Sequence, residues 1–191
     1  VAPPAPVVDV ARGASLAAWR AQPEVAAQRA RLRDANLLII SIDALRADRL
    51  TPGDPTVPRL DGLRAESVAF VNALAPAAGT DVSMAAVATG RWNPFQAIPA
   101  TLAEAVAATG RTTHAILPRE VLRYAGKTLL TRGWATVDEV VTDGARRDIG
   151  DRITAGATTD RALAFLDRVG AGRFALWIVT GATGLWFGEA V

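Results

Sequence analysis

Two short segments place reactive side chains beside elements that can hold them rigidly. Asp43 directly follows residues 36–42, whose sequence is NLLIISI. A short, continuous apolar run with β-branched residues is typical of a strand buried on both faces of a parallel sheet. Ligands of such sheets bind beyond the carboxyl ends of the strands, where a carboxylate can hold a hard divalent cation. The alternative is that Asp43 caps the next helix through its side-chain oxygen.

The second segment is residues 79–84, GTDVSM, which lead into a run of small residues typical of a helix. A hydroxyl at a helix N-terminus lies among free backbone N–H groups, where sulfate or phosphate is also stabilised. A nearby metal ion would help to deprotonate Thr80 and make it a nucleophile. The alternative is an ordinary helix cap formed by Thr80, Asp81 or Ser83.

The elements around these segments alternate between strands and helices, which predicts an α/β fold with a mostly parallel sheet flanked by helices. Strands are expected at residues 36–42, 67–74, 112–117, 135–141 and 173–179. Helices are expected at residues 15–33 with a break near Pro23, and at 57–66, 80–89, 101–109 and 154–168. Gly90 and Gly110 are expected to end the third and fourth of these helices.

Composition excludes several classes of function. The 191 residues are 50% hydrophobic and carry a net charge of +2, without a basic, aromatic-rich cluster that would bind nucleic acid. No apolar run approaches the roughly 20 residues that a membrane helix needs. The sequence has no cysteine, which excludes disulfides and thiolate metal sites. The one histidine, His114, is expected to be buried or at a sheet edge with its hydrogen bonds satisfied.

Four motifs follow one another in a specific order and spacing. The first is the strand with Asp43 and the Leu-Arg-Ala-Asp turn, and the second is Val-Pro-Arg-Leu-Asp-Gly-Leu at 57–63. The third is Thr80-x-x-Ser83, and the fourth is Thr-Gly-Arg ending at Arg91. Together they resemble the N-terminal part of the catalytic domain of the sulfatase family, within the alkaline phosphatase superfamily.

The resemblance implies an alkaline phosphatase-like fold and a metal-dependent hydrolase or transferase of sulfate or phosphate esters. Asp43 would be a metal ligand, and Thr80 would be the covalent nucleophile and also touch the metal. Ser83 and Lys127 would bind the anion, and Arg91 would be structural. The resemblance implies a divalent cation, Ca²⁺ with Mn²⁺ or Zn²⁺ as alternatives. Substrates would be small-molecule, glycan or lipid esters, and the location would be extracytoplasmic.

The expected organisation is a Pro-rich linker or tail at 1–14, a leading helix at 15–35 and the sulfatase-like part at 36–179. Residues 180–191 do not resemble the family. The resemblance implies that the remaining metal ligands lie further downstream, so we expect a fragment that is inactive by itself. Three positions depart from the family pattern: Ala44, Val82 and Met84. They favour an alternative, a degenerate anion-binding or structural member or a non-functional truncated gene product.

Overall fold

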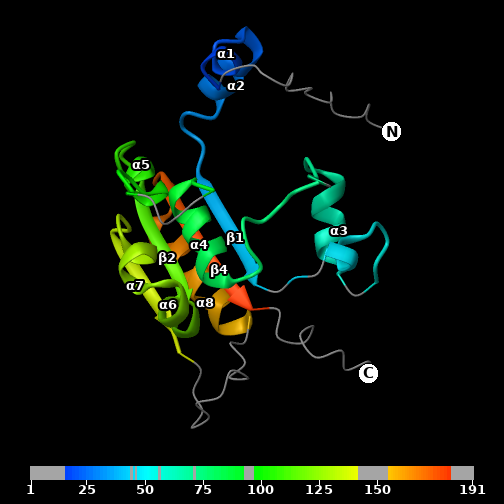
Figure 1. Cartoon of the computed structure of the whole chain (residues 1–191), viewed down its shortest axis with the longest axis vertical. Coiled ribbons are helices and arrows are strands. Elements are labelled where there is room, and N and C mark those ends of the chain that lie inside the picture. Colours follow the sequence, from blue (N-terminus) through cyan, green and yellow to red (C-terminus); the bar gives the residue numbers. More distant parts are fainter. Residues whose placement is uncertain are drawn as a thin grey trace.

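Four parallel strands form the central sheet of the computed structural model (Figure 1). The structure describes residues 16–43, 45, 47–55, 57–70, 72–92, 97–141 and 155–181. The strands are β1 (Leu37–Asp43), β2 (Thr112–Pro118), β3 (Thr136–Val140) and β4 (Phe174–Gly181). Their spatial order is β1-β4-β2-β3, and all three pairings are parallel. The expected α/β fold with a parallel sheet is therefore confirmed.

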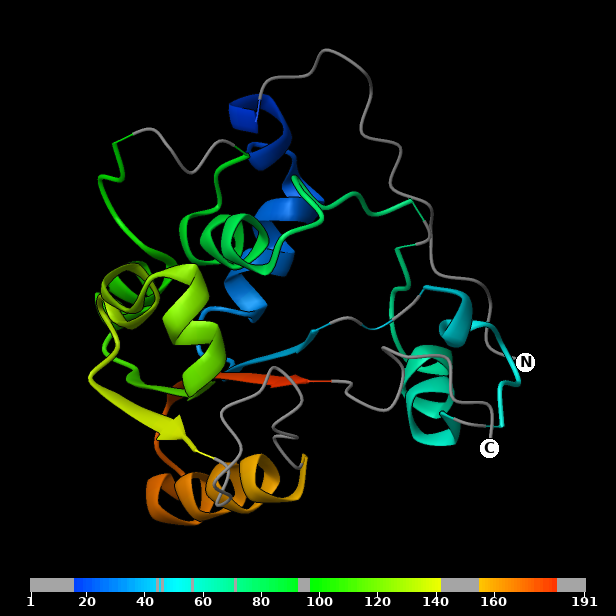
Figure 2. The same ribbon diagram turned by 60° about the horizontal axis from the view of Figure 1, so that its bottom comes forward.

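Helices cover both faces of this sheet. The helices of the described structure are α1 (Leu16–Arg20), α2 (Pro23–Arg31), α3 (Pro58–Ala65), α4 (Thr80–Thr89), α5 (Leu102–Ala107), α6 (Arg119–Ala125), α7 (Lys127–Thr131) and α8 (Ala155–Val169). A 3₁₀ turn, η1 (Ala47–Leu50), follows β1. Figure 2 shows α4, α6 and α7 on one side of the strands and α8 on the other. The connection from β1 to β2 crosses on the α4 face, and that from β3 to β4 returns on the α8 face. These two connections run in opposite directions across the sheet, so a right-handed sense for both places them on opposite faces.

Side chains alternate between the two faces and form two cores. On β2, Ala115 and Leu117 point toward α4, α6 and α7, while Ile116 points toward α8. The first core comprises Met84, Ala88, Ala115, Leu117, Val121, Leu122, Leu130, Trp177 and Val179. The second comprises Ile116, Val140, Ala162, Phe165, Leu176 and Ile178. This period-two pattern fixes the register of each strand, because a slip of one residue would exchange the two cores.

The helix boundaries follow from local signals in the sequence. The break predicted near Pro23 is present, and Pro23 is the first residue of α2. Gly90 ends α4 in the left-handed conformation, with φ 64°. Thr101 caps α5 in a capping box with Glu104. The short helices α6 and α7, divided by Gly126 at φ 91°, were not expected from the sequence.

Two expectations about strands are wrong. Residues 67–70 and 72–74 form no strand, and Val68, Phe70 and Leu74 are 70–83% exposed. The apolar pattern there has no paired backbone beside it, and a strand needs such a partner. β1 was expected to be buried on both faces, but Leu38 and Ile40 are about half exposed. β1 lies at the edge of the sheet, and α8 packs over the strands beside it.

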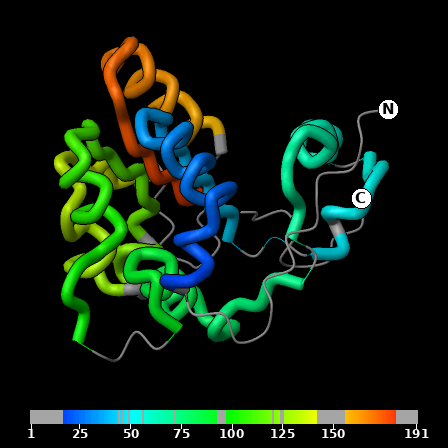
Figure 3. The backbone as a smooth tube through the Cα atoms, turned by 90° about the horizontal axis from the view of Figure 1, so that it is seen from above, coloured from blue at the N-terminus to red at the C-terminus, as the bar shows by residue number. Residues whose placement is uncertain are grey.

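Two regions project from the sheet. Figure 3 shows α3, in cyan and teal, lying apart from the strands, and α1 and α2, in blue, leading into β1. No residue of α3 is buried, and Leu63 is 60% exposed. The sheet with α4 to α8 therefore contains most of the buried core, and it is this part that positions the candidate site.

Candidate metal and nucleophile site

Asp43 is the last residue of β1, at the carboxyl edge of the sheet. Alternation places its side chain on the same face as Ile39 and Ser41. Ile39 packs against the core beneath α4, and Ser41 Oγ accepts a hydrogen bond from Trp177 Nε1 at 3.0 Å. These contacts fix the register of β1, so the carboxylate of Asp43 lies toward α4.

Thr80, the first residue of α4, meets Asp43 across 37 positions of sequence. Its Oγ1 lies 3.3 Å from both Oδ1 and Oδ2 of the carboxylate. A hydroxyl has one proton, so it donates to a position shared between the two oxygens. An O–H to carboxylate bond is usually about 2.5–2.7 Å long. Asp43 and Thr80, the two candidate residues from the sequence, therefore face each other. Their separation is longer than the usual length of such a hydrogen bond.

The first turn of α4 has unused backbone donors. Its cap residue is Gly79, which forms no side-chain cap, and the first helical bond runs from the Ser83 N–H to the Gly79 carbonyl. The N–H groups at residues 80–82 are therefore outside the helical ladder, which suits an anion. The predicted caps Thr80, Asp81 and Ser83 are wrong, because all three lie within the helix.

Gly79 and Asp81 approach each other closely at the site, which was not expected from the sequence. A Cβ at Gly79 would lie 2.5 Å from Asp81 Oδ1, so the carboxylate of Asp81 folds back over the cap residue. A carboxylate in the first turn is stabilised by the helix dipole, and it also opposes a second anion there. The glycine immediately before Thr80 was the available signal, because it allows this close approach.

Ser83 and Arg91, the other predicted site residues on and after α4, form hydrogen bonds that hold the turns at the two ends of this helix. Ser83 Oγ donates to the Ala77 carbonyl at 2.8 Å, which holds the turn before α4. The Arg91 backbone N–H donates to Thr89 Oγ1 at 3.3 Å, next to the left-handed Gly90. Ser83 is thus engaged with the backbone, and Arg91 takes part in the turn that ends the helix.

Lys127 lies at the other edge of the sheet. Its Nζ donates to Glu139 Oε2 at 3.0 Å, and Arg119 Nε donates to Oε1 of the same carboxylate at 2.5 Å. Hydrogen bonds from Arg119 and Lys127 lower the pKa of Glu139. Glu139 is on β3, three strand spacings or about 14 Å from β1. The structure therefore joins Asp43 with Thr80 and leaves Lys127 with Glu139.

The donors at the site suit a hard cation in their chemistry. Asp43 and Thr80 supply oxygen atoms, which Ca²⁺ and Mg²⁺ prefer. Ca²⁺ takes about 6–8 oxygen ligands. Within the described ranges, no group of three or more His, Cys, Asp or Glu side chains could hold a metal ion. The pair would therefore provide part of a coordination shell, completed by water or substrate oxygens.

His114 is buried on β2, as the sequence predicted, but only one of its ring nitrogens has a good partner. Nδ1 lies 2.7 Å from Thr136 Oγ1, and Nε2 lies 3.5 Å from Asp138 Oδ2, without a hydrogen bond in the described structure. The ring stacks on Phe165 of α8 at 4.6 Å. Burial lowers the pKa of His114, against the opposing charge of Asp138. The histidine thus belongs to the packing between β2 and α8.

Comparisons with family models, curated proteins and solved structures give no match to this chain. Each helix in the part of the chain that the structure describes falls short of the length and apolar character needed to cross a bilayer.

Proposed function

We propose that the chain carries part of the active site of a metal-dependent hydrolase or transferase of sulfate or phosphate esters, within an alkaline phosphatase-like fold. The observation that carries the proposal is the contact of 3.3 Å between Thr80 Oγ1 and both carboxylate oxygens of Asp43. It supports a hydroxyl nucleophile beside a hard oxygen ligand, the two roles that the sulfatase resemblance implies.

Thr80 would act as the nucleophile. Its hydroxyl would give its proton to water as Oγ1 forms a bond to the sulfur or phosphorus of the ester. The bond from that atom to the ester oxygen breaks on the side opposite Oγ1, and the departing alkoxide takes up a proton from water. Water then hydrolyses the ester on Thr80, releasing sulfate or phosphate; transfer to an alcohol would follow the same course.

Asp43 would also hold the divalent cation, with Thr80 contributing its hydroxyl oxygen. A bound cation would lower the pKa of a hydroxyl and neutralise charge that develops on the ester. The free N–H groups of the first turn of α4 would receive the anionic oxygens of the substrate. The carboxylate of Asp81 beside them disfavours an anion, so positive charge from the cation would be needed to offset it.

A second candidate is a domain that binds an anion without turnover. The observation that favours it is the engagement of Ser83 with Ala77 and of Lys127 with Glu139, which leaves neither predicted anion-binding side chain at Thr80. Met84, where the resemblance implies an arginine, is 8% exposed and packs in the core.

Mass spectrometry after a single turnover separates the two candidates. The chain is incubated with excess aryl sulfate or aryl phosphate and Ca²⁺, Mn²⁺ or Zn²⁺, then digested and mapped. We expect a metal-dependent sulfate or phosphate group on Thr80 without continued turnover, because the first half of the reaction needs only nucleophile, metal and ester. The group should be lost in Thr80→Ala and kept in Thr128→Ala, which changes an exposed threonine of α7. A chain that binds sulfate but never becomes modified would favour the second candidate.

A further inference from the structure

Three basic side chains lie on one face of the sheet near the carboxyl ends of β2 and β3. Arg119 Nε donates to Glu139 Oε1 at 2.5 Å, and Lys127 Nζ donates to Oε2 of the same carboxylate at 3.0 Å. Arg123 lies one turn beyond Arg119 on α6, so their two guanidinium groups share a helix face, where like charges repel. Among the described side chains of this cluster, three positive charges therefore meet one carboxylate.

Most hydrogen-bond donors of this cluster have no partner within the described residues. A guanidinium group has five N–H donors and an ammonium group has three. Arg119 uses only Nε, and Lys127 uses one of its N–H groups. The side chain of Arg123 has no hydrogen bond or ion pair in the described part of the chain. Arg119 and Lys127 are 56% and 67% exposed, so a ligand can reach these donors from solvent.

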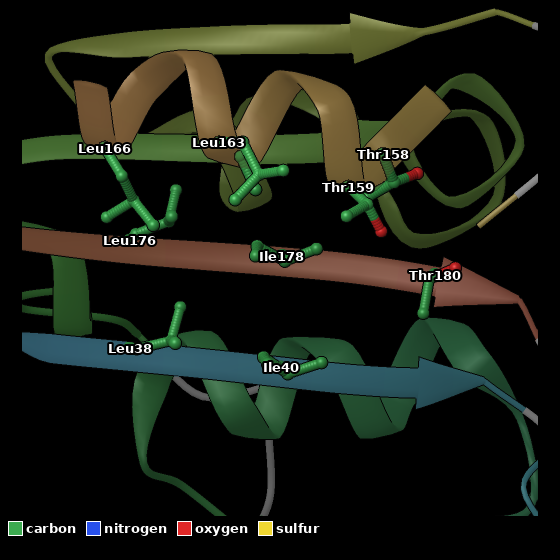
Figure 4. A pocket seen from close by; sticks show the side chains of 10 residues that line it. Leu38, Ile40, Thr158, Thr159, Leu163, Leu166, Leu176, Ile178 and Thr180 are labelled. Atoms are coloured by element: carbon green, nitrogen blue, oxygen red, sulfur yellow. The ribbon is translucent and has the colours of Figure 1, made fainter. Parts of the chain in front are cut away.

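The topology of the sheet places this cluster where α/β proteins bind ligands. After β2 the chain continues into α6 and α7, which pack on the same face as α4. The next element after β3 is α8, on the opposite face, where Leu166 lies against Leu176 and Ile178 of β4 (Figure 4). β2 and β3 are neighbours, so the elements that follow them diverge to opposite faces. In open sheets, ligands bind outside the carboxyl ends of the strands at such a point of divergence.

We propose that Arg119, Arg123 and Lys127 form a second anion-binding site, outside the carboxyl ends of β2 and β3, for the phosphate group of a small molecule. A guanidinium fork matches two oxygens of a phosphate, and an ammonium group adds a point charge. A phosphate dianion balances the two positive charges that Glu139 leaves uncompensated. A single carboxylate of a ligand would balance only one of them.

Glu139 prepares the site before a ligand binds. Its carboxylate holds Arg119 by one oxygen and Lys127 by the other, so both long side chains are ordered in the free protein. Ordering such side chains in advance reduces the entropy that binding costs. This site is distinct from the Asp43–Thr80 pair, since Glu139 is three strand spacings from β1, and it requires no metal ion.

Titration of the full chain with inorganic phosphate in metal-depleted buffer tests the proposal. Binding is followed by the ¹H–¹⁵N signals of the Arg119 and Arg123 side-chain Nε–H groups, which should shift and saturate. Arg119→Gln and Lys127→Gln should each weaken phosphate binding about tenfold, because each removes a charged donor. Arg59→Gln removes the same charge from an exposed position on α3 and should leave the affinity nearly unchanged.

Two further arms separate this site from the Asp43–Thr80 pair and phosphate from carboxylate. Thr80→Ala should bind phosphate as wild type does, and a loss of binding only in Thr80→Ala would move the anion to that residue and overturn the proposal. Acetate should bind about tenfold more weakly than phosphate, because it has one charge. Equal affinities for acetate and phosphate would contradict a phosphate site.

Two results at the cluster itself would also overturn the proposal. One is an equal weakening by Arg59→Gln and Arg119→Gln, which would mean that net charge alone attracts phosphate. The other is a set of Arg119 and Arg123 signals that shift without saturation or do not shift.

Discussion

The candidate site depends on two residues that lie at the ends of neighbouring elements. Asp43 ends β1, and Thr80 begins α4, which packs on the same face. Each could be selected from the sequence, because an apolar strand ending in Asp and a Gly-Thr before a helix are local signals. Their 3.3 Å contact was not readable from local signals, since it depends on how 36 intervening residues fold.

The hydrogen-bond partners of Ser83 and Lys127 could not be predicted from the residues themselves. Lys127 was expected to bind the anion only because of the family resemblance, but its position follows from α7, a helix that was not expected from the sequence. Its partner Glu139 becomes its neighbour only through the pairing of β2 with β3. Such contacts are set by sheet order, which local sequence does not specify.

Thr101 gives a stability prediction at the residue scale. Its hydroxyl accepts the Glu104 N–H at 3.2 Å, and Glu104 in turn accepts the Thr101 N–H at 2.8 Å. Thr101 Oγ1 also donates to the Arg132 carbonyl. Thr101→Ala should lower the free energy of unfolding by about 1–2 kcal/mol, measured by urea denaturation. The exposed Thr128→Ala is the matched control, and equal losses in both variants would refute the cap.

His114 makes stability depend on pH. Its pKa in the folded protein lies below the ordinary value of 6.5, mainly because the ring is buried. The unfolded chain then binds more protons just below pH 6.5, so stability should be full above that pH and fall as pH decreases toward the folded pKa. Below the pKa of His114 in the folded protein, the free energy of unfolding should stop decreasing.

Thermal unfolding between pH 7.5 and 5 checks this dependence. His114→Gln should flatten the curve in that window, because glutamine does not titrate. Asp138→Asn should steepen it, because Asp138 is the charge that raises the histidine pKa. A wild-type curve that is flat between pH 6.5 and 5 would contradict the expected shift. Glu104 and Glu139, whose pKa values are lowered, should add losses only below about pH 4.5.

At the scale of helices and strands, the sequence pattern predicted the bounds of an element correctly where a residue that ends the element was also present. Helix α4 was expected at 80–89 and has those bounds, with Gly90 at its end. The segment 67–74 has an equally good strand pattern but no pairing partner in the described structure. Pairing is a tertiary property, which explains why strand prediction failed there and succeeded for β2 and β4.

The corner between α5 and β3 should be sensitive to glycine replacement. Gly133 has φ 89°, and a Cβ there would lie 2.7 Å from the Glu104 backbone nitrogen. Gly110 has φ 77° but open space around its Cβ position. Gly110→Ala should cost about 1–2 kcal/mol from backbone strain. Gly133→Ala should cost about 1–3 kcal/mol more, because the packed backbone of α5 must move. Denaturation of both variants measures this difference, and equal costs would contradict the close packing.

Across the whole molecule, stability is expected to be uneven. α3 has no buried residue, whereas β4 is central and almost fully buried from Ala175 to Val179. Amide hydrogen exchange should therefore be much faster in α3 than in β4. Mass spectrometry of peptic fragments measures both regions in one experiment. Protection of α3 equal to that of β4 would mean that another part of the molecule covers it.

The α/β class of the molecule followed from its alternating elements, but the order β1-β4-β2-β3 did not. The exposed face of β1 is a consequence of that order, because it places an apolar strand at the edge. The sequence pattern of β1 was typical of a strand buried on both faces, so the half-exposed Leu38 and Ile40 are a difference between expectation and structure that follows from the strand order.

We propose that Asp43 and Thr80 form the metal-binding end of a hydrolytic site, and titration with Mn²⁺ tests this proposal most directly. Binding is followed by calorimetry or by the Mn²⁺ spin-resonance signal. Asp43→Asn should weaken Mn²⁺ binding at least tenfold, because it removes the charged ligand. Asp167→Asn, at an exposed position on α8, is the control and should leave the affinity unchanged. Equal Mn²⁺ affinities for wild type and Asp43→Asn would contradict the claim.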